Sequence, residues 1–185
     1  IYPGIDSKKI QNEIYAKNPK ELFNLSHESK VILYPGHYYL GCNKDLIDLV
    51  RAKKNRYPKM TFIFACRIAS ERDEKLKEEI KAALREEIDS GLLILLDNVD
   101  SILTLISRAD VVIFPPRIMT KKSEIPLALL EALALRKPIV ITDIPPLNEI
   151  MKRNVGEIIP AGNSPALIQA IDKLLENPQL TQSKG

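Results

Sequence analysis

Residues 123–132, with the sequence SEIPLALLEA, place two carboxylates around an apolar segment that contains a proline. Glu124 and Glu131 lie seven positions apart, and the polar, basic stretch 117–122 comes directly before them. Glu131 stands among leucines and alanines, and a carboxylate on so apolar a helix needs a polar partner if it is buried. A ligand rich in hydroxyl groups would be such a partner.

The same stretch also has a purely structural interpretation. Ser123 is a good N-cap for a helix predicted over residues 125–135, and Pro126 falls in its first turn, where the missing N–H costs nothing. Ser123 and Glu124 would then only cap the helix and complement its dipole. Both interpretations stay open from these residues alone.

Six short apolar runs alternate with segments of helical periodicity along the chain. Most of these runs have apolar residues at successive positions, which is typical of strands buried on both faces. They span residues 31–34, 60–65, 92–96, 110–114, 137–142 and 157–159. Helices are predicted over 44–54, 71–88, 101–108, 125–135, 147–151 and 165–176. This alternation predicts an α/β fold, a doubly wound parallel sheet with helices on both faces.

Composition bounds the class of protein. The 185 residues suffice for one domain, predicted over 31–180 after a lead-in segment at 1–30 and before a tail at 181–185. A net charge of +3 with interspersed signs argues against nucleic acid as a partner. Cys42 and Cys66 are predicted to be reduced structural thiols. Without a long apolar run or a signal segment, the chain is predicted to be cytoplasmic and to lack a transmembrane segment.

The loops after the strands are where a ligand is expected, because in an open parallel sheet the crevice lies beyond the carboxyl ends of the strands. Much of the positive charge outside the helices falls in these loops: His37, Lys44, Arg67, Arg72, Arg117, Lys121 and Lys122. An anionic ligand, with phosphate as the natural candidate, is therefore expected there. Gly36 and Gly41 flank two tyrosines in the first loop but match neither the dinucleotide-binding fingerprint nor the lysine-serine phosphate loop.

The order of these pieces resembles the C-terminal, donor-binding half of retaining GT-B glycosyltransferases of the group 1, or family 4, type. VILYPGH resembles the first strand and glycine turn of that half, RADVVIFPP resembles the strand before the signature loop, and SEIPLALLEALALRKPIVITDIPPLNEI resembles the signature itself. VGEIIPAGNSPALIQAIDKLLENPQL resembles the closing strand and helix. The resemblance implies a Rossmann-like domain that binds a nucleotide-diphosphate sugar.

The resemblance also implies roles for particular residues. Glu131 matches the second glutamate of the family's signature, which holds the ribose hydroxyls, whereas the first glutamate falls on Ser123 and makes Glu124, one place later, the catalytic candidate. The family's arginine after the glycine turn falls on His37, and its lysine falls on Cys42, with Lys44 nearby. The residues expected to contact the donor are Gly36, His37, Lys44, Arg67, Ser123, Ile125, Pro126, Leu127 and Glu131.

By the same resemblance, transfer retains the anomeric configuration and donor binding needs neither metal nor cofactor. The IYPGID start, which lacks a methionine, resembles the segment that enters this half from an N-terminal acceptor-binding domain. That domain is therefore an expected partner, and peripheral membrane association is possible through it. The alternatives are a non-catalytic nucleotide-sugar-binding or regulatory domain, a GT-B epimerase, and an interaction domain without a small ligand.

Overall fold

The computed structural model describes residues 10, 28–54, 56, 59–119, 125–151 and 155–177. Six strands form one sheet in which every neighbouring pair is parallel. They are β1 (Lys30–Tyr34), β2 (Met60–Cys66), β3 (Leu93–Asp97), β4 (Val111–Phe114), β5 (Ile139–Thr142) and β6 (Gly156–Ile159). Their order in the sheet is β3-β2-β1-β4-β5-β6, so the strand order reverses between β1 and β4.

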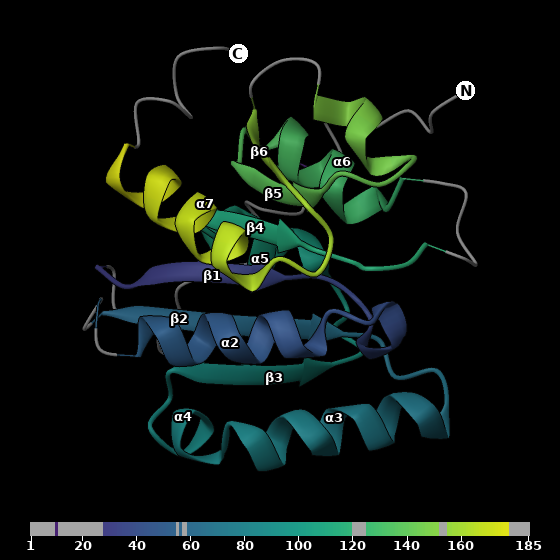
Figure 1. Cartoon of the computed structure of the whole chain (residues 1–185), viewed down its shortest axis with the longest axis vertical. Helices are drawn as coiled ribbons and strands as arrows, with labels where there is room; N and C mark the ends of the chain where they lie inside the picture. The colour runs from purple at the N-terminus through teal and green to yellow at the C-terminus, as the bar shows by residue number, and fades with distance from the viewer. Residues whose placement is uncertain are drawn as a thin grey trace.

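The helices lie on both faces of this sheet (Figure 1). They are α2 (Asn43–Lys53), α3 (Glu71–Ala83), α4 (Arg85–Asp89), α5 (Ile102–Arg108), α6 (Leu127–Ala134) and α7 (Ser164–Glu176), with short 3-10 turns at η1 (Tyr38–Leu40) and η2 (Leu147–Met151). Helices α2 and α7 contact each other on one face, and α5 and α6 contact each other on the other. The predicted doubly wound α/β fold is therefore confirmed.

Burial follows the apolar runs of the sequence. Every residue of β2, β4 and β5 is buried, and β1 is buried after its first residue. The edge strands β3 and β6 are only partly buried. Consecutive apolar residues therefore mark the central strands, whose two faces are both covered by helices.

Two predicted helices differ from those observed. The segment 71–88 is divided at Leu84, whose φ of −123° and ψ of 32° interrupt the helix and whose side chain is fully buried. The helix predicted from residue 125 begins at Leu127 instead, because Pro126 has an extended ψ of 130° and the residue before a proline is disfavoured in helical geometry. The N-cap of α6 is therefore Pro126, and Ser123, the predicted cap, lies outside the described residues.

Candidate functional site

A cavity of about 570 Å³ opens at the carboxyl ends of the strands, on both sides of the point where the strand order reverses. Its lining comes from the ends of β1, β2 and β4, the loop after β3, and the first residues of α5 and α6. The lining residues are Pro35, Gly36, His37, Ala65, Cys66, Arg67, Asn98, Val99, Ile102, Phe114, Pro126, Leu127 and Ala128. In doubly wound sheets this crevice is the usual position of a ligand.

The first loop turns tightly over a buried tyrosine. A Cβ atom on Gly36 would lie 2.2 Å from the ring of Tyr34, so only glycine fits there. The hydroxyl of Tyr34 donates a hydrogen bond to the carbonyl of His37 (2.9 Å), and the ring of His37 packs against that of Tyr39 with centroids 5.0 Å apart. The buried side chain of Tyr34 therefore fixes the path of this loop along the cavity, through its contacts with Gly36 and His37.

The loops after β1, β2 and β3 are hydrogen bonded to one another. The backbone N–H of Arg67 donates to the carbonyl of Gly36 (3.3 Å), and that of Asn98 donates to the carbonyl of Cys66 (3.3 Å). Asn98 has a left-handed φ of 47°, which asparagine tolerates well, and its side-chain oxygen accepts from the N–H of Ile68 (3.3 Å). The exposed side chain of Arg67 thus starts from a fixed backbone position.

Helix α6 points its N-terminus at the cavity. Pro126, Leu127 and Ala128 line the cavity, and the first N–H groups of a helix have no partner within the helix. These groups and the helix dipole favour an anion at this position. Leu127, with 53% of its surface exposed, adds an apolar side chain at the same place.

The ionisable groups beneath the first loop are held neutral. Burial raises the pKa of Cys42 to about 12, and it also raises the pKa of Cys66 and of Tyr34 well above their ordinary values. Both cysteines are free and buried, as predicted for structural thiols. Cys66, although it lines the cavity, is a protonated thiol at neutral pH and therefore a poor nucleophile.

The structure brings together five of the residues predicted to contact a donor: Gly36, His37, Arg67, Pro126 and Leu127. Ile125 is buried beside the start of α6 and does not line the cavity. Glu131 lies one turn after Leu127 on the same side of α6 and is partly buried. Ser123 and Glu124 lie outside the described residues.

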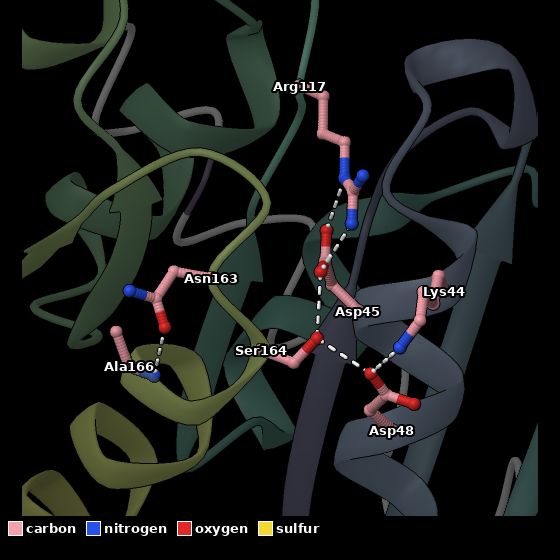
Figure 2. A network of polar contacts seen from close by, with 7 residues as sticks. All are labelled: Lys44, Asp45, Asp48, Arg117, Asn163, Ser164 and Ala166. Atoms are coloured by element: carbon pink, nitrogen blue, oxygen red, sulfur yellow. Dashed lines mark hydrogen bonds and ion pairs between the residues drawn. The ribbon is translucent and has the colours of Figure 1, made fainter.

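Lys44 is also outside the cavity lining. Its ammonium forms an ion pair with Asp48 one helical turn later (2.5 Å), and 73% of its side chain is exposed (Figure 2). This carboxylate–ammonium contact lowers the pKa of Asp48. For Lys44 to contact an anion in the cavity, its side chain would have to leave Asp48.

Several cavity residues were not named individually by sequence reasoning, which expected the nucleobase only near Arg67 and the loops after Leu96 and Phe114. Asn98, Val99, Ile102 and Phe114 form the wall beside Arg67. They lie directly after β3, at the start of α5 and at the end of β4. These positions could have identified them from the sequence, because residues at strand ends in such sheets face the crevice. Their mostly apolar character made them indistinguishable from core residues.

Neither a metal cluster nor a membrane span is found among the residues that the structure describes. Within those ranges, histidine, cysteine and acidic side chains do not gather in threes around a common point where a metal ion could be held. The described helices are also too short or too polar to cross a bilayer.

Solved structures of other proteins share this fold. The chain superposes on an alpha,alpha-trehalose-phosphate synthase from Burkholderia xenovorans with a TM-score of 0.77 at 13% identity, covering 98% of this chain and 45% of that one. It superposes on the Anabaena HepE protein in complex with UDP with a TM-score of 0.76 at 19% identity, covering 98% and 48%. The fold is therefore that of a Rossmann-like GT-B domain, and the chain spans less than half the length of either structure.

The family model described as glycosyl transferases group 1 matches residues 29–177. The chain therefore belongs to this family, and the predicted resemblance to a group 1 glycosyltransferase domain is confirmed. A curated relative, the alpha-D-kanosaminyltransferase of Streptomyces kanamyceticus, is 27% identical over 80 residues, which are 43% of this chain and 20% of the relative.

Proposed function

We propose that this chain is the donor-binding half of a glycosyltransferase that transfers a sugar from a nucleotide-diphosphate sugar with retention of configuration. The observation that carries the proposal is the cavity between the loop after β1 and the N-terminus of α6, where the strand order reverses. Membership of the group 1 family supports it, as does the related fold of HepE, which was solved with UDP and with UDP-glucose.

The diphosphate would lie between the first turn of α6 and the side chains of the loops after β1 and β2. Leu127 and Ala128, whose N–H groups have no partner within the helix, border the cavity together with Arg67 and His37. When the sugar–phosphate bond breaks, its electron pair passes to the leaving phosphate. Preorganised N–H groups and cations therefore stabilise the transition state more than the bound substrate.

The nucleoside would occupy the apolar wall. Val99, Ile102 and Phe114 present an apolar surface beside Asn98, and a volume of about 570 Å³ falls in the usual range for small-molecule sites. Glu131 would hold the ribose hydroxyls, because a partly buried carboxylate on an apolar helix gains from accepting two hydroxyl hydrogen bonds. The proposed catalytic role of Glu124 rests on its sequence position.

The remaining parts of the proposal concern what lies outside this chain. The acceptor site would come from an N-terminal domain that closes over the cavity, since this chain covers only 48% and 45% of the two solved neighbours. Donor binding would need no metal and no cofactor, because helix-end N–H groups and side-chain cations would balance the charge of the diphosphate.

Calorimetric titration of the chain with UDP, GDP, ADP and their common sugars tests the donor site. We expect one nucleotide to bind and Arg67→Gln to raise its Kd about tenfold, the loss of one charged hydrogen bond. Arg72→Gln is the matched control, because Arg72 is an exposed cation on α3 outside the cavity lining. Glu131→Gln should also weaken binding. An absence of binding by every nucleotide at millimolar concentration would overturn the proposal.

A transfer assay separates an enzyme from a regulatory binder. The chain joined to its N-terminal half should transfer sugar from the nucleotide sugar that the chain binds, and the anomeric configuration of the product can be read by NMR. Binding without transfer would favour the non-catalytic alternative. An inverted product would contradict retention.

A further inference from the structure

Three segments far apart in the sequence meet in one polar network beside the loop after β1 (Figure 2). The guanidinium of Arg117 donates two hydrogen bonds to the carboxylate of Asp45, from Nε to Oδ2 and from Nη2 to Oδ1, each 2.9 Å long. Asp45 belongs to the first turn of α2 and is 2% exposed, whereas Arg117 follows β4. A two-pronged contact of this kind fixes the orientation of both groups.

The third segment is the N-terminus of α7. The hydroxyl of Ser164 lies 2.9 Å from the carboxylate of Asp45 and 2.8 Å from that of Asp48. A hydroxyl carries one proton and therefore donates to one of the two carboxylates at a time. Two carboxylates, the guanidinium of Arg117 and the ammonium of Lys44 make the network neutral in sum.

The backbone around Arg117 is held as well. Its N–H donates to the carbonyl of Leu40 in the loop after β1 (3.0 Å), and the hydroxyl of Thr142 at the end of β5 donates to the carbonyl of Pro116 (2.8 Å). Gly162, at a φ of 72°, lies so close that a Cβ there would be 3.2 Å from Arg117 Cζ. Arg117, whose side chain is 39% exposed, is therefore contacted by the loop before α7 and by the loop that carries His37.

We propose that Arg117 is a positioning residue, which sets the chain leaving β4 against the loop after β1 and thereby shapes the cavity that lies between them. This inference rests on the proposed donor site, and it gives a positioning role to Arg117, which the sequence placed among the loop cations near an anionic ligand. Its guanidinium already pairs with Asp45, a contact that raises its pKa and keeps it charged. Phe114, three residues before Arg117, and His37, three before Leu40, both line the cavity.

Charge-neutralising and charge-conserving variants distinguish positioning from direct anion contact. If Arg117 bound the diphosphate directly, Asp45→Asn would leave the guanidinium of Arg117 without its carboxylate partner and would lower the Kd for UDP. Arg117→Lys would then retain UDP binding. Positioning predicts the opposite: Arg117→Gln, Arg117→Lys and Asp45→Asn each raise the Kd for UDP about fivefold to tenfold, since lysine cannot form the two-pronged contact. The double variant Arg117→Gln, Asp45→Asn should be no weaker than either single one.

Arg56→Gln serves as the matched control. Arg56 follows α2 and forms ion pairs with two residues of α7, Asp172 (3.0 Å) and Glu176 (3.1 Å). These contacts lie at the opposite end of the two helices from Arg117. We expect its change to lower the melting temperature without altering the Kd for UDP. Equal Kd values in Arg117→Gln and the parent, or a tighter Kd in Asp45→Asn, would overturn the inference.

Amide hydrogen exchange in the absence of nucleotide tests the positioning role of Arg117 independently of the proposed donor site. Arg117→Gln and Ser164→Ala should each speed exchange in peptides covering residues 36–42 and 115–119, while Arg56→Gln should not. Unchanged exchange in both variants would contradict positioning even if UDP binds. Faster exchange in a chain that binds no nucleotide would instead retain the positioning role and reject the donor site.

Discussion

Helices α2 and α7 are connected by a cluster of polar and charged side chains near each of their two ends. The two clusters have different neighbours. At the far end from the cavity, the ammonium of Lys53 pairs with Asp172, and Arg56 contacts the same carboxylate. The side chain of Lys53 is 1% exposed, so this is a buried ion pair. At the cavity end, Asp45 and Ser164 also join the two helices, but there Arg117 adds a third segment.

The difference indicates what each cluster does. A buried ion pair gives little net stability over an apolar contact, yet removing one partner leaves an uncompensated charge. The far cluster connects α2 and the turn after it to α7, away from the cavity, and its loss should reduce stability without changing nucleotide affinity. The cavity cluster also holds the backbone that leaves β4, so its loss should change the shape of the site. Stability and nucleotide affinity are therefore expected to respond separately at the two ends.

The largest effect is expected at the far end. Asp172→Ala removes the carboxylate beside the buried ammonium of Lys53 and should lower the free energy of unfolding by about 3–5 kcal/mol, measured by urea denaturation. Lys173→Ala, which breaks an exposed pair with Glu157, should cost less than about 1 kcal/mol. The double change Lys53→Met, Asp172→Leu should recover most of the loss. A large change of the UDP Kd in Asp172→Ala would contradict the claim that the far cluster affects stability without affecting nucleotide affinity.

A substitution at Gly36, in the turn after β1, should affect both stability and UDP affinity. Gly36→Ala places a Cβ 2.2 Å from the ring of Tyr34, which should cost about 1–3 kcal/mol and displace the loop that carries His37. UDP binding should weaken as well. Gly91→Ala is the control, because a Cβ there meets no atom within 4 Å and its φ of 75° costs about 1–2 kcal/mol. Unaltered UDP binding in Gly36→Ala would place the nucleotide elsewhere.

Alkaline pH should destabilise the fold through the buried thiol under the cavity loop. The pKa of Cys42 is raised from 9.0 to about 12 by burial, so above pH 9 the unfolded state loses this proton first. Its stabilising contribution is complete below pH 9 and declines by about 1.4 kcal/mol per pH unit up to pH 12. Urea midpoints between pH 8 and 10.5 measure this slope. Cys42→Ala should reduce the slope, and an unchanged slope would show that the thiol has the same pKa in the folded and unfolded states.

The smallest effect is expected for the exposed member of the cavity network. Lys44→Ala breaks an ion pair of which the lysine is 73% exposed, and it should change the free energy of unfolding by less than about 0.5 kcal/mol. Its proposed contact with the diphosphate predicts a rise of the UDP Kd of about threefold or less. Lys81→Ala, on an exposed pair with Glu78 on α3, is the control. A Kd identical to that of the parent would remove Lys44 from the donor site.

Much of the fold was predictable because its signals are local. Consecutive apolar residues predict the central strands, and strand-end loops predict where a ligand lies. The break at Leu84 and the start of α6 at Leu127 were missed, since helix ends depend on packing and on the backbone of one residue. Contacts between distant segments leave no periodic signal: Arg117 and Asp45 are 72 positions apart, and Arg117 was listed only as one of the loop cations near an anionic ligand.

Mapping the bound nucleotide by amide hydrogen exchange tests the central claim most directly. With UDP present at saturating concentration, we expect slower exchange in peptides covering residues 34–42, 65–68, 97–102 and 125–130, which surround the cavity at the carboxyl ends of the strands. Peptides of α4 and of the far ends of α2 and α7 should not change. Protection confined to those distant peptides would contradict the account.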